Sequence, residues 1–364
     1  MLFRSYIWEH DILKRDYVED NMIGDFQQFC MYICGLTGKP NKESVDRFMS
    51  LQSIFGYLLH DEFANVNLKT ILFIDVNKNH VGKPAGGTGK GIIGKAIGWM
   101  ANSEDSDKKY ISIGGKGFDP KFDRRYSEGD QTTKIVHIED IAKDFDFEDF
   151  FNDVTDKAEF RKAGGNSTRH HIKTMLSSNS PIDTSAPSFK RRLIVFELDN
   201  YFNANRTPVD VFGKWFFSKQ WNEMDWAQFD TFMIKCCHYY MSTKDTIKED
   251  GKVFGIQEPP LINYKQQLLR TKLSEDFIAW FADWINNAVI EMRTVEYVKN
   301  TLYEAFSKKY TEYSSRERYA RAFTKWCKFY LETMEIPSGE KRSTQDLLIL
   351  YPPLDDEKID YIYK

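Results

Sequence analysis

The spacing of apolar residues changes along the chain and divides it into helical and strand-forming stretches. From Ser44 to Phe63 apolar positions recur at helical spacing, which predicts a helix. Between residues 69 and 200, helical stretches and glycine turns separate the apolar runs KTILFIDV (69–76), KYISI (109–113), TKIVHIEDI (133–141), IKTMLSSN (172–179) and RRLIVFEL (191–198). Four or five such runs predict an α/β fold with a mainly parallel sheet flanked by helices.

The same pattern predicts a division into four parts. Residues 1–62 are expected to form a helical segment, and residues 63–249 an α/β core. The glycines and paired prolines of 250–263 are typical of a linker, and 264–364 are expected to form a smaller helical domain, with a winged-helix-like unit as one alternative.

Composition restricts the class of protein. The chain has 364 residues, of which 41% are hydrophobic and 29% charged, as in ordinary soluble globular proteins. It has no run of 18 apolar residues and begins without the apolar region of a signal peptide, so we predict a cytoplasmic location in a host cell and no membrane partner. Five cysteines without a CxxC pair predict reduced, buried thiols, and the histidines include no HExxH motif of a zinc enzyme.

Charge is distributed unevenly although the net charge is only −4. Residues 139–159 contain nine acidic side chains against two lysines, whereas residues 161–192 contain seven lysines and arginines against one aspartate. A mildly acidic protein can bind nucleic acid when its basic side chains gather on one surface.

The stretch PAGGTGKG (84–91) follows an apolar strand and precedes a helix. This context suits a phosphate-binding loop, in which backbone N–H groups and the helix N-terminus face phosphate oxygens. Two positions depart from GxxxxGK[ST], since Pro84 replaces the first glycine and Gly91 the Ser or Thr; a plain strand-to-helix turn is the alternative. The expected nucleotide-binding residues are Gly86, Gly87, Thr88, Gly89, Lys90 and Gly91.

Three further elements follow in order. The strand in KIVHIED ends in Glu139 and Asp140, the form of a Walker B segment that holds Mg²⁺ and polarises the attacking water. Asn179 ends the next strand, at the edge where parallel sheets bind ligands. Arg191 and Arg192 stand immediately before the last strand.

Together, GGTGKG, VHIED, SSN and FKRR resemble the superfamily 3 helicases, a branch of the AAA+ ATPases, over roughly residues 45–240. The likeness is greatest to the helicase part of phage and plasmid primase-helicases. It implies ATP and Mg²⁺ as cofactors, Lys90 as the phosphate lysine, Glu139 and Asp140 as the Walker B acids that hold the metal, and Asn179 as the γ-phosphate sensor. It also implies that Arg191 or Arg192 enters the site of a neighbouring subunit, in a homo-oligomer that is a hexameric ring.

Gly91 puts the direct hydroxyl ligand of Mg²⁺ in doubt. Because Mg²⁺ keeps several waters and takes few carboxylates, a water can fill the missing position. With Lys90, both acids, Asn179 and the arginine pair all present, a working ATPase is favoured over a degraded one.

Two basic segments are candidate nucleic-acid contacts. FRKAGGNSTRHH (160–171) predicts a hairpin, and in superfamily 3 enzymes a hairpin here tracks DNA; its candidate residues are Arg161, Lys162, Arg169, His170 and His171. RERYARAFTKWCKFYL (316–331) predicts a helix with an aromatic core face (Tyr319, Phe323, Trp326, Tyr330) and a basic face (Arg318, Arg321, Lys325, Lys328). For both segments, a merely solvated basic surface is the alternative.

The sequence therefore predicts an ATP-dependent helicase of a phage, plasmid or mobile-element replication system, acting on single-stranded DNA at a forked duplex. Any priming would come from another chain or from a missing N-terminal portion. Two alternatives stay open: a P-loop NTPase or kinase acting on a small molecule, and a non-catalytic nucleotide-bound replication scaffold.

Overall fold

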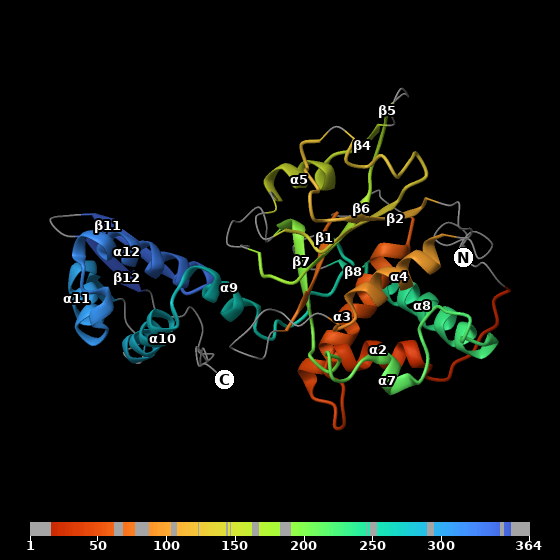
Figure 1. Cartoon of the computed structure of the whole chain (residues 1–364), viewed down its shortest axis with the longest axis horizontal. Coiled ribbons are helices and arrows are strands. Elements are labelled where there is room, and N and C mark those ends of the chain that lie inside the picture. The colour runs from red at the N-terminus through yellow and green to blue at the C-terminus, as the bar shows by residue number, and fades with distance from the viewer. Residues whose placement is uncertain are drawn as a thin grey trace. The chain divides into compact units, whose positions relative to one another are not determined.

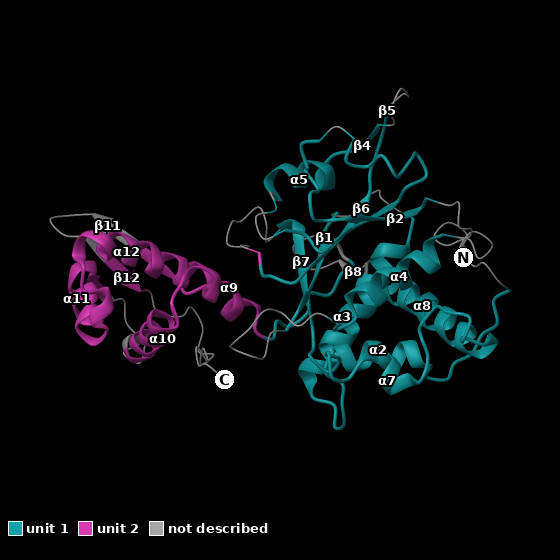
Figure 2. Cartoon of the chain, in the orientation of Figure 1, with its two compact units in different colours: residues 1–181, 187–262 teal, residues 182–186, 263–364 magenta. Residues whose placement is uncertain are grey.

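The structure is a computed structural model in which the chain forms two compact units (Figures 1 and 2). Unit 1 comprises Met1–Pro181 and Pro187–Ile262, and unit 2 comprises Ile182–Ala186 and Asn263–Lys364. The described residues are 16–61, 68–76, 87–102, 108–122, 124–142, 145, 147–161, 167–182, 191–244, 246–247, 253–289, 295–342 and 346–350.

Unit 1 is built on a five-stranded sheet in the order β2-β3-β6-β1-β7, in which all four pairings are parallel. The strands are β1 (Thr70–Asp75), β2 (Tyr110–Gly114), β3 (Ile135–Glu139), β6 (Lys173–Ser178) and β7 (Leu193–Leu198). They coincide with the five predicted apolar runs. The prediction of an α/β fold with a mainly parallel sheet is thereby confirmed.

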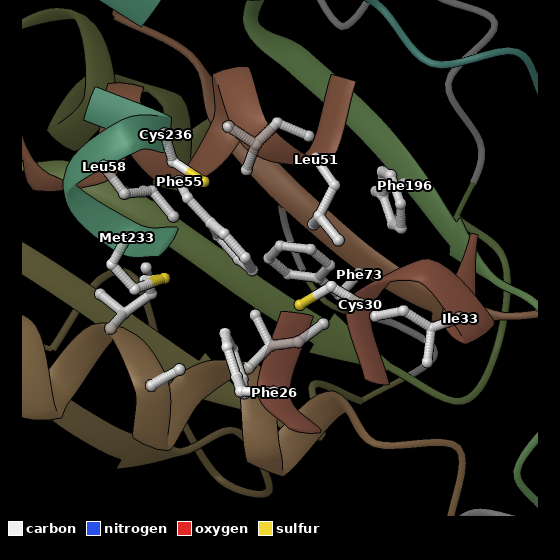
Figure 3. Close-up of a cluster of buried hydrophobic side chains, with 14 of the residues drawn as sticks. Phe26, Cys30, Ile33, Leu51, Phe55, Leu58, Phe73, Phe196, Met233 and Cys236 are labelled. Carbon is white, nitrogen blue, oxygen red and sulfur yellow. The ribbon is translucent and has the colours of Figure 1, made fainter. Parts of the chain in front are cut away.

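The central strands are buried along their length because helices cover both sheet faces. Every residue of β1 and of β6 is buried. Ile71 and Phe73 join a core with α2 (Asp25–Ile33), α3 (Lys42–Leu59), α4 (Lys90–Ala101) and α8 (Glu223–Lys244). Figure 3 shows part of this core, with Phe26, Phe55 and Met233 packed together. Leu72 and Ile74 alternate with Ile71 and Phe73 along β1, so they point to the other face of the sheet. Figure 1 shows α5 (Phe147–Thr155) on that side.

One glycine fixes how closely the two longest helices of unit 1 approach. A Cβ on Gly56 of α3 would lie 2.4 Å from the Cys236 carbonyl oxygen of α8. Helix α3 corresponds to the helix predicted for Ser44–Phe63. It begins two residues earlier, with Asn41 as its N-cap, and ends at Leu59.

Smaller elements complete unit 1. The predicted hairpin is present as an antiparallel pair, although its tip, residues 162–166, lies outside the described residues. Helix α8 begins at Glu223, with Glu223 and Asp225 in its first turn. The remaining elements are β4 (Ala158–Arg161), β5 (Ser167–His170), α7 (Pro208–Phe212), β8 (Thr246–Ile247) and β9 (Val253–Phe254).

Unit 2 combines helices with a three-stranded antiparallel sheet in the order β10-β12-β11. A purely helical domain lacks such a sheet, whereas the winged-helix-like alternative includes one. Its elements are α9 (Tyr264–Lys272), α10 (Glu275–Val289), β10 (Val295–Val298), α11 (Lys299–Lys309), η1 (Thr311–Tyr313), α12 (Arg316–Thr333), β11 (Ser338–Arg342) and β12 (Asp346–Leu350).

The five cysteines are free and buried, as predicted. Burial raises the pKa of the Cys34 and Cys237 thiols to about 12, so these thiols stay protonated and unreactive. Among the described helices, none is long and apolar enough to cross a membrane.

Candidate functional site

The loop before α4 has the backbone shape that its glycines permit. Gly87 and Gly89 have φ angles of 77° and 112°, in the region that side chains disfavour, and Lys90 is the first helical residue. A Cβ on Gly89 would lie 2.5 Å from Cζ of Phe29, so a larger residue would also collide with the core. Pro84 and Gly86 lie outside the described residues.

Gly91 stands in a different situation. A Cβ at this position would meet no atom within 4 Å, and Gly91 is an exposed residue of the first helical turn. Crowding therefore does not account for the glycine where a phosphate loop usually has Ser or Thr. A serine would fit here without displacing a neighbour.

A continuous chain of polar contacts runs from this loop to the predicted Walker B segment. The Thr88 hydroxyl and the Lys90 ammonium both donate to the Asp75 carboxylate. Lys90 Nζ also donates to Asn179 Oδ1 at 2.9 Å, and Asn179 Nδ2 donates to Asp140 Oδ1 at 2.6 Å. Residues far apart in the sequence are thus joined by direct hydrogen bonds.

Strand order explains why these side chains meet. β6 lies between β1 and β3, and parallel strands present their carboxyl ends at the same edge. Asp75 ends β1, Asn179 follows β6, and Asp140 follows β3. Asn179 therefore lies between the lysine of the loop and the acid of the next strand, at the edge where open α/β sheets bind ligands.

Asp140 is held in an uncommon backbone conformation. Its φ angle is 54°, a left-handed value that aspartate tolerates better than most residues. Its N–H donates to Ser177 Oγ at 3.1 Å, and Ile141 N–H donates to the Ser177 carbonyl at 2.9 Å, which fixes the turn against β6. Asp140 Oδ2 lies 3.3 Å from the exposed Lys116 ammonium.

Glu139 is directed toward β2 instead. Ser112 Oγ donates to Glu139 Oε1 at 2.5 Å, and His137 Nδ1 lies 3.5 Å from the same oxygen. His137 is buried and its Nδ1 is 2.9 Å from the Tyr110 hydroxyl. Burial lowers the pKa of His137 to about 4, against a smaller opposing effect of Glu139, so the imidazole is neutral near pH 7.

The two predicted metal ligands remain accessible, since the side chains of Glu139 and Asp140 are 50% and 45% exposed. Among the residues that the structure describes, no three or more His, Cys, Asp or Glu side chains gather as a metal cage. Two carboxylates suit Mg²⁺ only where phosphate oxygens and water supply the other ligands. The donor set therefore fits a metal that arrives with a nucleotide.

Arg191 and Arg192 are not part of this cluster. They precede β7, so they lie at the amino edge of the sheet, opposite the edge that carries Lys90 and Asp140. Arg191 is exposed, and the Arg192 guanidinium lies over the Phe151 ring at 5.5 Å.

The β4–β5 hairpin also lies near the amino edge, because His170 Nε2 is 2.8 Å from the carbonyl of Thr133, just before β3. Arg161 and Arg169 both donate to the Glu159 carboxylate, at 2.9 and 2.7 Å, and these bonds lower the Glu159 pKa to about 2. His170 is stacked on Phe160, and His171 Nδ1 is 3.0 Å from the Asp156 carbonyl. Lys162 lies outside the described residues.

Sequence reasoning did not include Asp75, Lys116 or Ser112 in the site. Asp75 carried a signal, since it is an acid that ends a buried strand in the same way as Glu139. Lys116 lies in the glycine-rich turn GGKG (114–117) after β2, where a Cβ on Gly115 would lie 2.6 Å from the Glu139 carbonyl oxygen. Ser112 is recognisable only from the pairing of β2 with β3.

No family model and no curated protein matches the chain. The solved structures that resemble it include two A form apo structures of the NrS-1 C-terminal region. The first, residues 305–718, has a TM-score of 0.41 and 12% identity, over 94% of this chain and 78% of that one. The second has a TM-score of 0.43 and 12% identity, over 96% and 79%.

Proposed function

We propose that the chain is an ATP-dependent helicase or translocase of superfamily 3 type, which moves along single-stranded DNA in a phage, plasmid or mobile-element replication system. The contact sequence Lys90–Asn179–Asp140 carries the proposal. The lysine at the start of α4, the amide after β6 and the acid after β3 meet at one sheet edge, an arrangement that would suit nucleotide hydrolysis.

ATP with Mg²⁺ would supply the phosphoanhydride bond that is cleaved and the cation that offsets its charge. Lys90, at the first turn of α4, would bind the β- and γ-phosphate oxygens together with the N–H groups of the helix N-terminus. Glu139 and Asp140 would hold the metal, and Asn179, already bonded to both Lys90 and Asp140, would orient the terminal phosphate.

The water that attacks needs a carboxylate held in place. Glu139 is half-exposed and its Oε1 accepts a hydrogen bond from Ser112, so its position is defined by the neighbouring strand. A general base must lie within hydrogen-bond reach of the water that it activates. In the proposed mechanism Glu139 is this base and accepts the proton of the water.

The arginine pair supports action between subunits. Arg191 and Arg192 lie at the opposite sheet edge from Lys90, so within one chain they do not serve the same phosphates. An arginine supplied by a neighbour can raise turnover by about 10³ to 10⁵. A ring of identical subunits, which the resemblance makes a hexamer, would give every site such an arginine.

DNA binding is assigned to the β4–β5 hairpin. Its tip carries Lys162, and its strands carry Arg161 and Arg169. Glu159 neutralises part of this charge, so the proposal assigns the hairpin a weak, salt-sensitive grip that can release at each step.

The test is ATP hydrolysis by the full chain, measured with and without single-stranded DNA and alongside the particle size. Lys90→Ala should abolish hydrolysis, whereas the matched control Lys95→Ala, an exposed lysine on the same helix, should retain it. Normal turnover by the Lys90 variant would exclude the phosphate-loop assignment.

The alternatives give different results in the same assay. Hydrolysis that DNA does not stimulate would favour a small-molecule P-loop enzyme, and nucleotide binding without hydrolysis would favour a scaffold. Mixing Arg191→Ala/Arg192→Ala subunits with Lys90→Ala subunits should restore partial activity, since some interfaces then pair an intact lysine with intact arginines. Inactive mixtures of assembled protein would overturn the role of these arginines between subunits.

A further inference from the structure

Unit 2 contains a helix–turn–helix. Its elements follow the order α10, β10, α11, α12, β11, β12, and the sheet order is β10-β12-β11. Helices α11 and α12 are joined by residues 310–315, which include the short η1 turn. This is the order of a winged helix-turn-helix, in which the second helix of the pair lies in a DNA groove.

The inner face of α12 is fixed in the core of unit 2. Phe323 is buried, and its ring centroid lies 5.5 to 5.6 Å from those of Phe277, Tyr303 and Phe306. The turn is tied to α11 by the Tyr303 hydroxyl, which donates to the Tyr313 carbonyl at 2.6 Å. The predicted aromatic face is therefore core, as expected, and it presents the other face of α12 outward.

That outer face is basic. Arg318, Arg321, Lys325 and Lys328 are all exposed, and on a helix they lie within roughly 80° of one another over about 15 Å. Lys328 lies 3.7 Å from Glu332, but within the described part of the chain no acidic partner is recorded for Arg321 or Lys325. We call these four residues the α12 basic stripe.

We propose that the α12 basic stripe binds double-stranded DNA, with α12 in the major groove and its cations on the flanking phosphates. Duplex DNA presents one negative charge per about 1.7 Å of axis, which complements four cations over about 15 Å. A helix about 10 to 12 Å across fits a groove about 12 Å wide.

The position of the aromatic side chains favours duplex over single-stranded DNA. Single-strand binding surfaces stack bases on exposed aromatic rings. Here the rings of α12 are committed to the core, since Phe323 and Tyr330 are buried and Trp326 packs against Phe277 at 5.4 Å. The α12 basic stripe therefore presents positive charges at fixed positions along a helix, which suits the regularly spaced phosphates of a duplex.

The experiment measures binding of the full chain to a 20-base-pair duplex by fluorescence anisotropy at several salt concentrations, without nucleotide. Arg321→Gln/Lys325→Gln/Lys328→Gln should weaken binding by about tenfold or more and reduce the slope of log affinity against log salt by about 2 to 3. The matched control Lys265→Gln/Arg270→Gln/Lys272→Gln removes the same charge from α9, where all three residues already contact partners. It should keep both the affinity and the slope.

Equal losses in the two variants would overturn the proposal, because net charge alone would then explain the binding. The proposal would also be overturned if a single strand of the same length competed with the duplex as well as unlabelled duplex does. Displacement of the duplex by polyglutamate would do the same, because the stripe would then bind acidic protein. Thermal unfolding of both variants separates loss of contacts from loss of fold. The assay contains no ATP, so its outcome is independent of whether the chain hydrolyses nucleotide.

Discussion

The sheet edge of unit 1 and the outer face of α12 in unit 2 both concentrate charge, but in opposite ways. At the sheet edge, Lys90 and Asp75 are bonded to each other and are only 13% and 6% exposed. On α12, the basic stripe is exposed and its one recorded ion pair, Lys328 with Glu332, is itself 62% and 48% exposed. One region satisfies its charges internally, and the other presents them to solvent.

This difference sets what each region can do. Charges that are buried and paired have fixed positions, which suits the alignment of a reacting group, but removing one leaves its partner poorly hydrated. Exposed cations contribute little to stability and are free to contact a polyanion in a salt-dependent manner. We therefore expect large, mutually dependent effects at the sheet edge and small, additive ones on α12.

Asp75→Ala should give the largest effect on stability. The partly buried Lys90 ammonium would lose its carboxylate, at a cost of up to about 3 to 5 kcal/mol, the range for removing one member of a buried pair. Chemical denaturation measures this, and Glu332→Ala on α12 is the contrasting control, expected to change stability by less than about 0.5 kcal/mol. Similar small values for both variants would remove the distinction between the two regions.

Gly89→Ala should be the next most damaging. The substitution places a Cβ on a backbone with φ of 112° and against the Phe29 ring, so we expect a loss of about 2 to 4 kcal/mol. Gly91→Ala adds the same methyl group two residues later in open helix, and it should be neutral or stabilise by up to about 1 kcal/mol. Thermal unfolding of the pair tests this; an equal loss would contradict the described loop geometry.

His137 should make stability depend on pH. Its pKa is about 4 in the folded chain and about 6.5 when unfolded, so the unfolded chain binds more protons between these values. Stability is then full above pH 6.5 and falls as the pH drops toward 4, by as much as about 3 kcal/mol. His137→Gln should remove this component of the pH profile, whereas His238→Gln, at an exposed position, should leave it in place.

The smallest effect concerns the hairpin, whose charges are paired although they are partly exposed. Because the pKa of Glu159 is about 2, this acid stays ionised and bonded to Arg161 and Arg169 at any ordinary pH. Glu159→Gln should free both arginines and raise single-stranded DNA affinity about two- to threefold. Asp156→Asn, which removes the same charge from a nearby exposed position, should give a smaller gain. Equal gains would show that the pairing has no influence.

The sequence by itself determined the parallel sheet. Each of the five strands lies in a short run with apolar residues at its centre, bounded by glycine or polar residues, and burial on both faces favours such runs. It also indicated the aromatic core face of α12, because a 3.6-residue period shows which side chains lie on one side of a helix. Both features follow from the spacing of side chains within a single strand or helix, so they can be predicted without knowing how the chain folds.

Only the tertiary structure decided which polar side chains meet. Asp75, Asn179 and Asp140 are brought together because β6 lies between β1 and β3, an order that no local pattern encodes. In the same way, the pairing of Arg161 and Arg169 with Glu159 follows from the hairpin register, and the small sheet of unit 2 joins β10 to β12, about 50 residues further on. The pairing of distant strands depends on the free energy of the whole fold. Whether a charged side chain is neutralised by a partner or can contact a ligand is therefore decided only when the neighbouring strands are in place.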